Sequence, residues 1–175
     1  SAQMMVILTR GFDLSLGANV SAVSVASAMV MTGLAANDAP AWIVVSLGLA
    51  TGLGFGALVG LFNGLFVSWL RISPFVVTLG SLNICFGLAT TMSGGRPVFN
   101  VPDSFSHFLY DGTLIPGLSL PLTMAIVVCL LLYFLLDHTV FGRALYLIGN
   151  NPRAAHLAGL PSRFYLTMAY VVAGM

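Results

Sequence analysis

The sequence contains no lysine, no glutamate and very little charge of either sign. Its 175 residues are 58% hydrophobic and only 6% charged, whereas soluble domains carry about 25% charged residues. Six arginines and five aspartates leave a formal net charge of +1, which gives no support to nucleic-acid binding. Without lysine, the chain cannot form a Gly-rich phosphate-binding loop that ends in Gly-Lys. The composition indicates an integral membrane protein in contact with lipid.

Cysteine and histidine, the usual metal ligands and nucleophile partners, are also scarce. Cys85 and Cys129 lie in apolar runs, where thiols usually behave as small hydrophobic side chains. His107, His138 and His156 fall outside the expected membrane spans, so no nucleophile and base are expected to meet inside the membrane. We therefore expect no catalytic site, no metal site and no cofactor bound by this chain.

Four charge-free stretches are each long enough to cross a hydrocarbon core, which needs about 20 helical residues. Backbone amides in lipid must bond within their own segment, and no strict two-residue alternation indicates a barrel, so the spans should be helices. We expect one all-α, polytopic transmembrane helix bundle over residues 1–175, as a fragment of a larger protein. The expected spans are 14–37, 39–70, 72–95 and 112–136, with partial spans at 4–9 and 164–175.

The arginines of the short loops predict the orientation, because positively charged loops stay in the cytoplasm. One arginine follows the second span and three follow the fourth, so the alternation of spans places all four on one side. Segment 137–163 is then a cytoplasmic loop, whereas the Asp38 turn and loop 96–111 lie on the opposite side. The four cytoplasmic arginines are Arg71, Arg143, Arg153 and Arg163.

A polar stretch from Arg143 to Leu160 separates two strongly apolar segments. Such a loop adds nothing to stability in the bilayer, so a helix-forming loop with several arginines indicates a surface that meets a soluble partner. The alternative is an amphipathic connector that lies on the lipid headgroups. The residues alone leave both interpretations open.

Small residues recur every fourth position in the second span, at Gly52, Gly56, Gly60 and Gly64. This spacing gives one helix face almost no side-chain bulk, and such faces are a main route to close helix packing in membranes. Packing against a helix of this chain is favoured over packing against another subunit, and both remain open.

Segment 10–17, Arg-Gly-Phe-Asp-Leu-Ser-Leu-Gly, places Asp13 and Ser15 just before the first full span. One interpretation is a helix break at membrane depth that lines a translocation path, since irregular backbone is tolerated there only where protein or water satisfies it. The other is a headgroup-level loop in which Asp13 caps the following helix. We give the two equal weight.

Polar side chains also enter the later spans, at Asn63, Thr78, Ser81 and Asn83. Because amides are costly to expose to lipid, we expect Asn63 and Asn83 to face the protein interior or a pore. Hydrogen bonding between helices is favoured over contact with a substrate. The second possibility makes these four residues candidates for lining a translocation path. Ser73 and Pro74 form a helix-start pattern before Thr78.

Four ordered motifs together resemble the permease subunits of bacterial ABC importers for monosaccharides, of the ribose, xylose, arabinose and galactose type. Residues 11–17 resemble Gly-Ile-Asp-Leu-Ser-Val-Gly, and residues 74–80 resemble Pro-Phe-Ile-Val-Thr-Leu-Gly. Residues 139–143 and 149–159 resemble Thr-Arg-Phe-Gly-Arg and Gly-Asn-x-x-Ala-Ala-x-x-x-Gly. The chain departs from the pattern at Arg10, where the family usually has a second glycine.

The resemblance implies a multi-pass permease of the bacterial inner membrane that imports a sugar. It implies a second permease subunit, a periplasmic sugar-binding protein and cytoplasmic ATPase subunits that hold ATP and Mg²⁺. The segment that matches residues 149–159 is the coupling helix of that family. The implied coupling residues are Gly149, Asn150, Asn151, Pro152, Arg153, Ala154, Ala155 and Gly159.

Residue physics supports a short rigid helix in this segment. Pro152 suits the first helical turn, and Gly159 can end the helix in a left-handed conformation.

For an uncharged sugar, a path of small, hydroxyl and amide groups without ion pairs is chemically sensible. The alternatives are a secondary transporter or channel, with Asp13 as its membrane-depth acid, and a scaffold that transports nothing.

Overall fold

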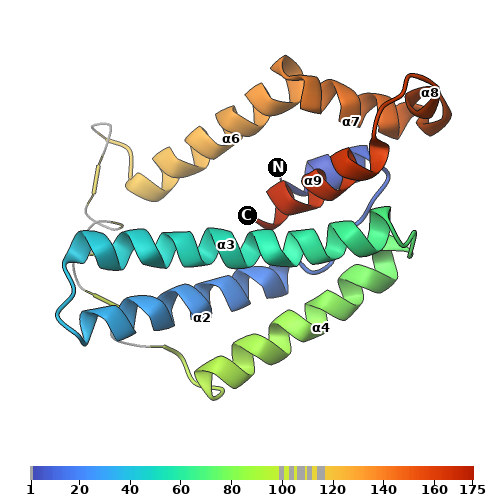
Figure 1. Ribbon diagram of the computed structural model, residues 1–175. Coiled ribbons are helices and arrows are strands. Elements are labelled where there is room, and N and C mark those ends of the chain that lie inside the picture. The colour runs from blue at the N-terminus through green and yellow to red at the C-terminus, as the bar shows by residue number, and fades with distance from the viewer. Residues whose placement is uncertain (1, 99–100, 103–104, 106–108, 110–111, 114–116) are drawn as a thin grey trace.

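The described residues form helices joined by turns, which confirms the predicted all-α membrane-spanning bundle (Figure 1). This computed structural model describes residues 2–98, 101–102, 105, 109, 112–113 and 117–175. The helices are α1 (Ala2–Leu8), α2 (Leu16–Ala35), α3 (Ala41–Ser68), α4 (Pro74–Ser93), α6 (Leu120–His138), α7 (Val140–Asn150), α8 (Pro152–Leu157) and α9 (Ser162–Gly174).

Four of these helices, α2, α3, α4 and α6, are long and apolar enough to cross a membrane. The predicted span 112–136 differs most from its helix, because α6 begins at Leu120 and continues to His138. The 28 residues of α3 give a rise of about 42 Å, close to a bilayer with its headgroups. Trp42 and Trp69, at the two ends of α3, are 71% and 54% exposed, as expected of interfacial tryptophans.

Helix α3 is the centre of the bundle, with α2 and α9 packed against it and α4 packed against α2 (Figure 1). The glycine face of α3 meets two different partners. A Cβ added at Gly52 would touch Ser27 of α2, whereas Cβ atoms at Gly56 and Gly60 would collide with the backbone of α9. At Gly64 the added Cβ would lie 2.8 Å from Thr167 Cα, also on α9. These small residues let the helix backbones approach closely.

Among the described helices, α6 packs against its neighbours near its C-terminal end. There Leu136 packs with Met5, Leu145 and Ala169 in one buried cluster. The remainder of α6 carries mostly exposed apolar side chains, as expected of a helix that faces lipid or another membrane helix. Helix α7 then continues toward α8 and packs against α1 and α9 with its apolar face buried (Figure 1).

The two ends of the bundle differ in charge. Helix α8 and the α3–α4 turn, which carries Arg71, lie at one end, and the α2–α3 turn with Asp38 lies at the other (Figure 1). Arg163 belongs to the first end, where its guanidinium lies 5.5 Å from the centre of the Trp69 ring. Its position over the ring allows a cation–π contact. Which end is cytoplasmic stays a prediction, and much of loop 96–111, including His107, lies outside the described residues.

Helix α4 begins at Pro74 with Ser73 at the N-cap position, as the sequence predicts, and the Ser73 side chain makes no capping hydrogen bond. Asn83 is exposed on α4, and its amide donates to the Leu79 carbonyl one turn earlier, at 2.8 Å. Asn83 therefore does not face the interior of the described helices, and its place along a pore stays a prediction. A polar side chain that bonds its own helix does not need a partner on another helix.

Candidate functional site

A buried polar cluster, which we name the polar junction, consists of Asp13, Ser15 and Asn63. The chain leaves helical geometry after Leu8 and resumes it at Leu16. Asp13 Oδ1 accepts hydrogen bonds from the Ser15 backbone N–H at 2.8 Å and from the Ser15 hydroxyl at 2.6 Å. Asn63 Nδ2, from α3, donates to Ser15 Oγ at 2.9 Å and to Asp13 Oδ2 at 3.5 Å. The junction therefore ties the helix break to the central helix.

Both interpretations of the break find support in this geometry. The Asp13 carboxylate lies at the N-terminus of α2, where a negative charge is favourable. Asp13 is only 4% exposed, so the other helices bury its carboxylate, and its depth relative to the lipid stays a prediction. Asn63 lies six residues before Trp69, which is about 9 Å of helix rise inside the predicted interface.

The polar junction and its surroundings hold more hydrogen-bonding capacity than the described contacts use. Three buried oxygens have no hydrogen-bond partner among the described residues: Asn63 Oδ1, Asn19 Oδ1 and the Tyr170 hydroxyl. Asn19 lies one turn after Ser15 on α2, and its Nδ2 donates to the Gly174 carbonyl of α9 at 2.9 Å. Unpaired buried polar groups are rare and costly. This region is the strongest candidate for a polar path through the described helices.

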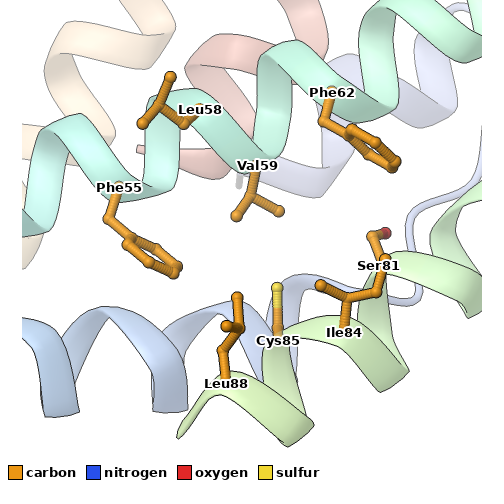
Figure 2. A pocket seen from close by; sticks show the side chains of 8 residues that line it. All are labelled: Phe55, Leu58, Val59, Phe62, Ser81, Ile84, Cys85 and Leu88. Carbon is orange, nitrogen blue, oxygen red and sulfur yellow. The ribbon is translucent and has the colours of Figure 1, made fainter. Parts of the chain in front are cut away.

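The other candidate lining residues do not join the polar junction. The Thr78 and Ser81 hydroxyls donate to carbonyls of their own helix, α4, one turn earlier. Ser81 lines a cavity of about 250 Å³ between α3 and α4, whose other lining residues are apolar (Figure 2). An apolar cavity with one hydroxyl offers little to a sugar, which needs several hydrogen-bond partners. Figure 2 labels those residues as Phe55, Leu58, Val59, Phe62, Ile84, Cys85 and Leu88.

Helix α8, which we name the docking helix, has a complete set of caps. Asn151 is extended, as the residue before a proline prefers, and its Oδ1 accepts from the Ala154 N–H at 3.0 Å. Gly159 ends the helix with φ 72°, and the Leu160 N–H donates to the Ala155 carbonyl at 3.1 Å. These bonds satisfy groups that a short helix leaves unpaired at both ends.

The docking helix is fixed to the bundle by its small residues. Ala155 is fully buried, so it holds the helix in place and does not face outward. Gly149, at the end of α7, lies so close to α1 that an added Cβ would collide with the Leu8 carbonyl oxygen. A displacement of the docking helix must therefore also move or strain α1.

The outward face of the docking helix carries a residue that sequence reasoning missed. Leu157 is 87% exposed, more than any other large hydrophobic residue described in the structure. It lies four residues after the exposed Arg153, so both side chains share one helix face. Its distance of two residues from Ala155 puts it on the opposite face from the buried side. Arginine and apolar side chains occur both in protein-binding surfaces and in helices that lie on lipid headgroups, so this face fits both interpretations of the loop.

No group of three or more histidine, cysteine or aspartate side chains that could hold a metal ion occurs in the described part of the chain. Of the remaining sequence-predicted residues, Asn150 at the end of α7 and Pro152 at the start of the docking helix are exposed, and Ala154 is half-buried.

The profile of the family described as "Branched-chain amino acid transport system / permease component" matches residues 1–175. The autoinducer 2 import system permease protein of Klebsiella pneumoniae is 36% identical over 89% of this chain and 46% of its own length. The D-allose transport system permease protein of Escherichia coli is 27% identical over 99% of this chain and 50% of its own length. The galactofuranose transporter permease protein of Escherichia coli is 35% identical over 98% of this chain and 47% of its own length.

The chain thus spans about half the length of the curated relatives it matches. No solved structure matches it. Together with these similarities, the four apolar helices identify a multi-pass protein of the bacterial inner membrane.

Proposed function

Because the chain belongs to the family of branched-chain amino acid transport system permease components, we propose that it forms membrane-spanning helices of an ATP-driven importer. In this proposal the chain lines part of the translocation path and hydrolyses nothing itself. Cytoplasmic ATPase subunits bind ATP and Mg²⁺, and a periplasmic binding protein delivers the substrate. A second permease subunit, identical or different, completes the path.

We propose monosaccharides and similar uncharged polyols as the substrate class. The relatives named for D-allose and galactofuranose support this class, although the family description names amino acids. The chemistry of the path supports it as well. A zwitterionic amino acid would call for charged partners of both signs, whereas the polar junction presents one carboxylate with hydroxyl and amide groups. Relatives named for several sugars have similar identities, so the proposal stops at the class.

One observation carries the assignment of ATP coupling: the docking helix exposes Leu157 beside Arg153 while Ala155 anchors its other face. Buried anchoring and caps at both ends make the helix rigid. A rigid element can transmit closure of the ATPase subunits as a rigid-body movement of the helices attached to it. A flexible connector on the headgroups would not need these caps.

The test is co-purification of the complete protein with its ATPase subunit, comparing wild type with Leu157→Asp. The carboxylate removes an exposed apolar contact and opposes binding to an apolar groove. Because the side chain is already exposed, the substitution should not disturb the fold. We expect the complex to be lost while the permease stays folded.

Asn37→Asp is the matched control, because it adds the same charge on an exposed turn at the opposite end of the bundle. It should leave the complex intact. A Leu157→Asp protein that still retains its ATPase subunit would refute the assignment of docking to α8. A wild-type protein without any ATPase partner would refute the proposed function as a whole.

A further inference from the structure

The Arg10 side chain bridges two segments that lie about 140 residues apart in the sequence. Its Nε donates to the Gly149 carbonyl at 2.8 Å, and its Nη2 donates to the Asn150 carbonyl at 3.2 Å. Both carbonyls belong to the last turn of α7, directly before the docking helix. The C-terminal end of a helix carries partial negative charge, so a planar guanidinium fits this position well.

The sequence leaves these two carbonyls in need of an outside donor. In a continuous helix the N–H groups of Arg153 and Ala154 would bond these two carbonyls, but Asn151 is extended and breaks the helix before them. The Ala154 N–H is already taken by the Asn151 side chain. The bonds from Arg10 therefore satisfy groups that the break between α7 and α8 leaves open.

The backbone of Arg10 adopts a conformation that favours glycine. Its φ is 60°, which is strained for a residue with a side chain. It ends α1 in a Schellman motif, in which the Arg10 N–H donates to Ile7 and the Gly11 N–H donates to Val6, both at 2.9 Å. Glycine is the usual residue at this position of the motif. A strained residue persists where its surroundings compensate for it, and the two bonds to α7 do so.

Arg10 is also close along the chain to the polar junction. Asp13 lies three positions after Arg10, which is at most about 11 Å of extended backbone. Little free space surrounds the intervening Gly11, because an added Cβ would lie 2.7 Å from the Tyr170 hydroxyl. A displacement of Arg10 should therefore also displace Asp13 and Ser15.

We propose that Arg10 is a positioning residue that connects the docking helix to the polar junction. The proposal rests on the proposed function, since it assumes that the docking helix moves with an ATPase subunit. When the end of α7 moves, its two carbonyls carry the guanidinium with them. The segment after α1 then shifts Asp13 and Ser15 relative to Asn63 on α3. Arg10 and the segment that follows it thus move together with the docking helix. Binding of the ATPase subunit and the geometry of the polar junction therefore change together.

The experiment uses the complete transporter, with its ATPase and binding protein, in proteoliposomes. Uptake of radiolabelled substrate and ATP hydrolysis are measured on the same vesicles for wild type, Arg10→Gly and Arg10→Lys. Glycine suits the left-handed backbone, so Arg10→Gly keeps the end of α1 and removes only the bridge. We expect uptake per ATP hydrolysed to fall about fivefold, a modest coupling effect. Arg10→Lys should restore part of the loss, since an ammonium can reach one carbonyl but lacks the planar fork.

Arg71→Gly is the matched control, because Arg71 has φ 57° and lies at the same end of the bundle. It should leave uptake per ATP unchanged. If Arg10→Gly gives the wild-type ratio, even with less assembled transporter, the positioning role is overturned and Arg10 is only structural. If wild type shows no ATP-driven uptake, the proposed function itself fails, which the wild-type vesicles reveal independently of any variant.

Discussion

Replacing Gly64 by alanine should separate α3 from α9. The new Cβ would lie 2.8 Å from Thr167 Cα and 2.9 Å from the Thr167 carbonyl oxygen, whereas ordinary contacts begin at 3.4 Å. Both atoms belong to the backbone, so no side chain can rotate away. The two helices must therefore move apart by about 0.6 Å, the difference between 3.4 and 2.8 Å.

This separation also weakens a buried hydrogen bond one turn along the same face. The Ser68 and Thr167 hydroxyls are 2.7 Å apart and both are buried. Overpacking costs about 1–3 kcal/mol, and a weakened hydrogen bond adds up to about 1 kcal/mol. We expect the unfolding midpoint of the complete protein in detergent to fall by several degrees.

Gly54→Ala provides the matched control on the same helix, because nothing lies within 4 Å of its added Cβ. Alanine favours a helix over glycine by about 0.5–1 kcal/mol, so this variant should be as stable as wild type or slightly more stable. Thermal unfolding of both variants in one detergent makes the comparison. Equal midpoints for Gly64→Ala and Gly54→Ala would refute the close contact between α3 and α9.

Two further predictions concern the candidate site. Asn151→Ala removes the side-chain cap of the docking helix, at a cost of about 1 kcal/mol, and should weaken binding of the ATPase subunit in a titration; unchanged affinity would show that the cap is not needed for docking. Asn63→Leu removes the donor to Ser15 and Asp13. It should lower the free energy of unfolding by about 1–3 kcal/mol, and it should also lower substrate uptake per folded protein. Its matched control is Asn37→Leu, because Asn37 is exposed on the α2–α3 turn and donates only to the Gly33 carbonyl one turn earlier, and equal effects of the two would contradict the polar junction.

The sequence predicts the spanning helices well because their signal is local. Long charge-free stretches must become helices in lipid, whatever they pack against. The caps of the docking helix are also local, since Asn151, Pro152 and Gly159 each favour one backbone conformation. Such features can be predicted without knowing any tertiary contact.

Features that depend on tertiary contacts escaped prediction. A six-residue helix has too few turns for its pattern to show which face is buried, so the burial of Ala155 and the exposure of Leu157 emerge only in the fold. The Arg10 bridge joins residues about 140 positions apart, and no local sequence pattern predicts such a contact.

The most direct test of the account is substrate uptake by proteoliposomes that contain the complete transporter, with ATP or a proton gradient as the only energy source. The account predicts uptake of a monosaccharide that requires ATP and is lost in Leu157→Asp, whose side chain replaces the exposed leucine of the docking helix. Uptake that a proton gradient drives without ATP, and that Leu157→Asp leaves unchanged, would contradict it.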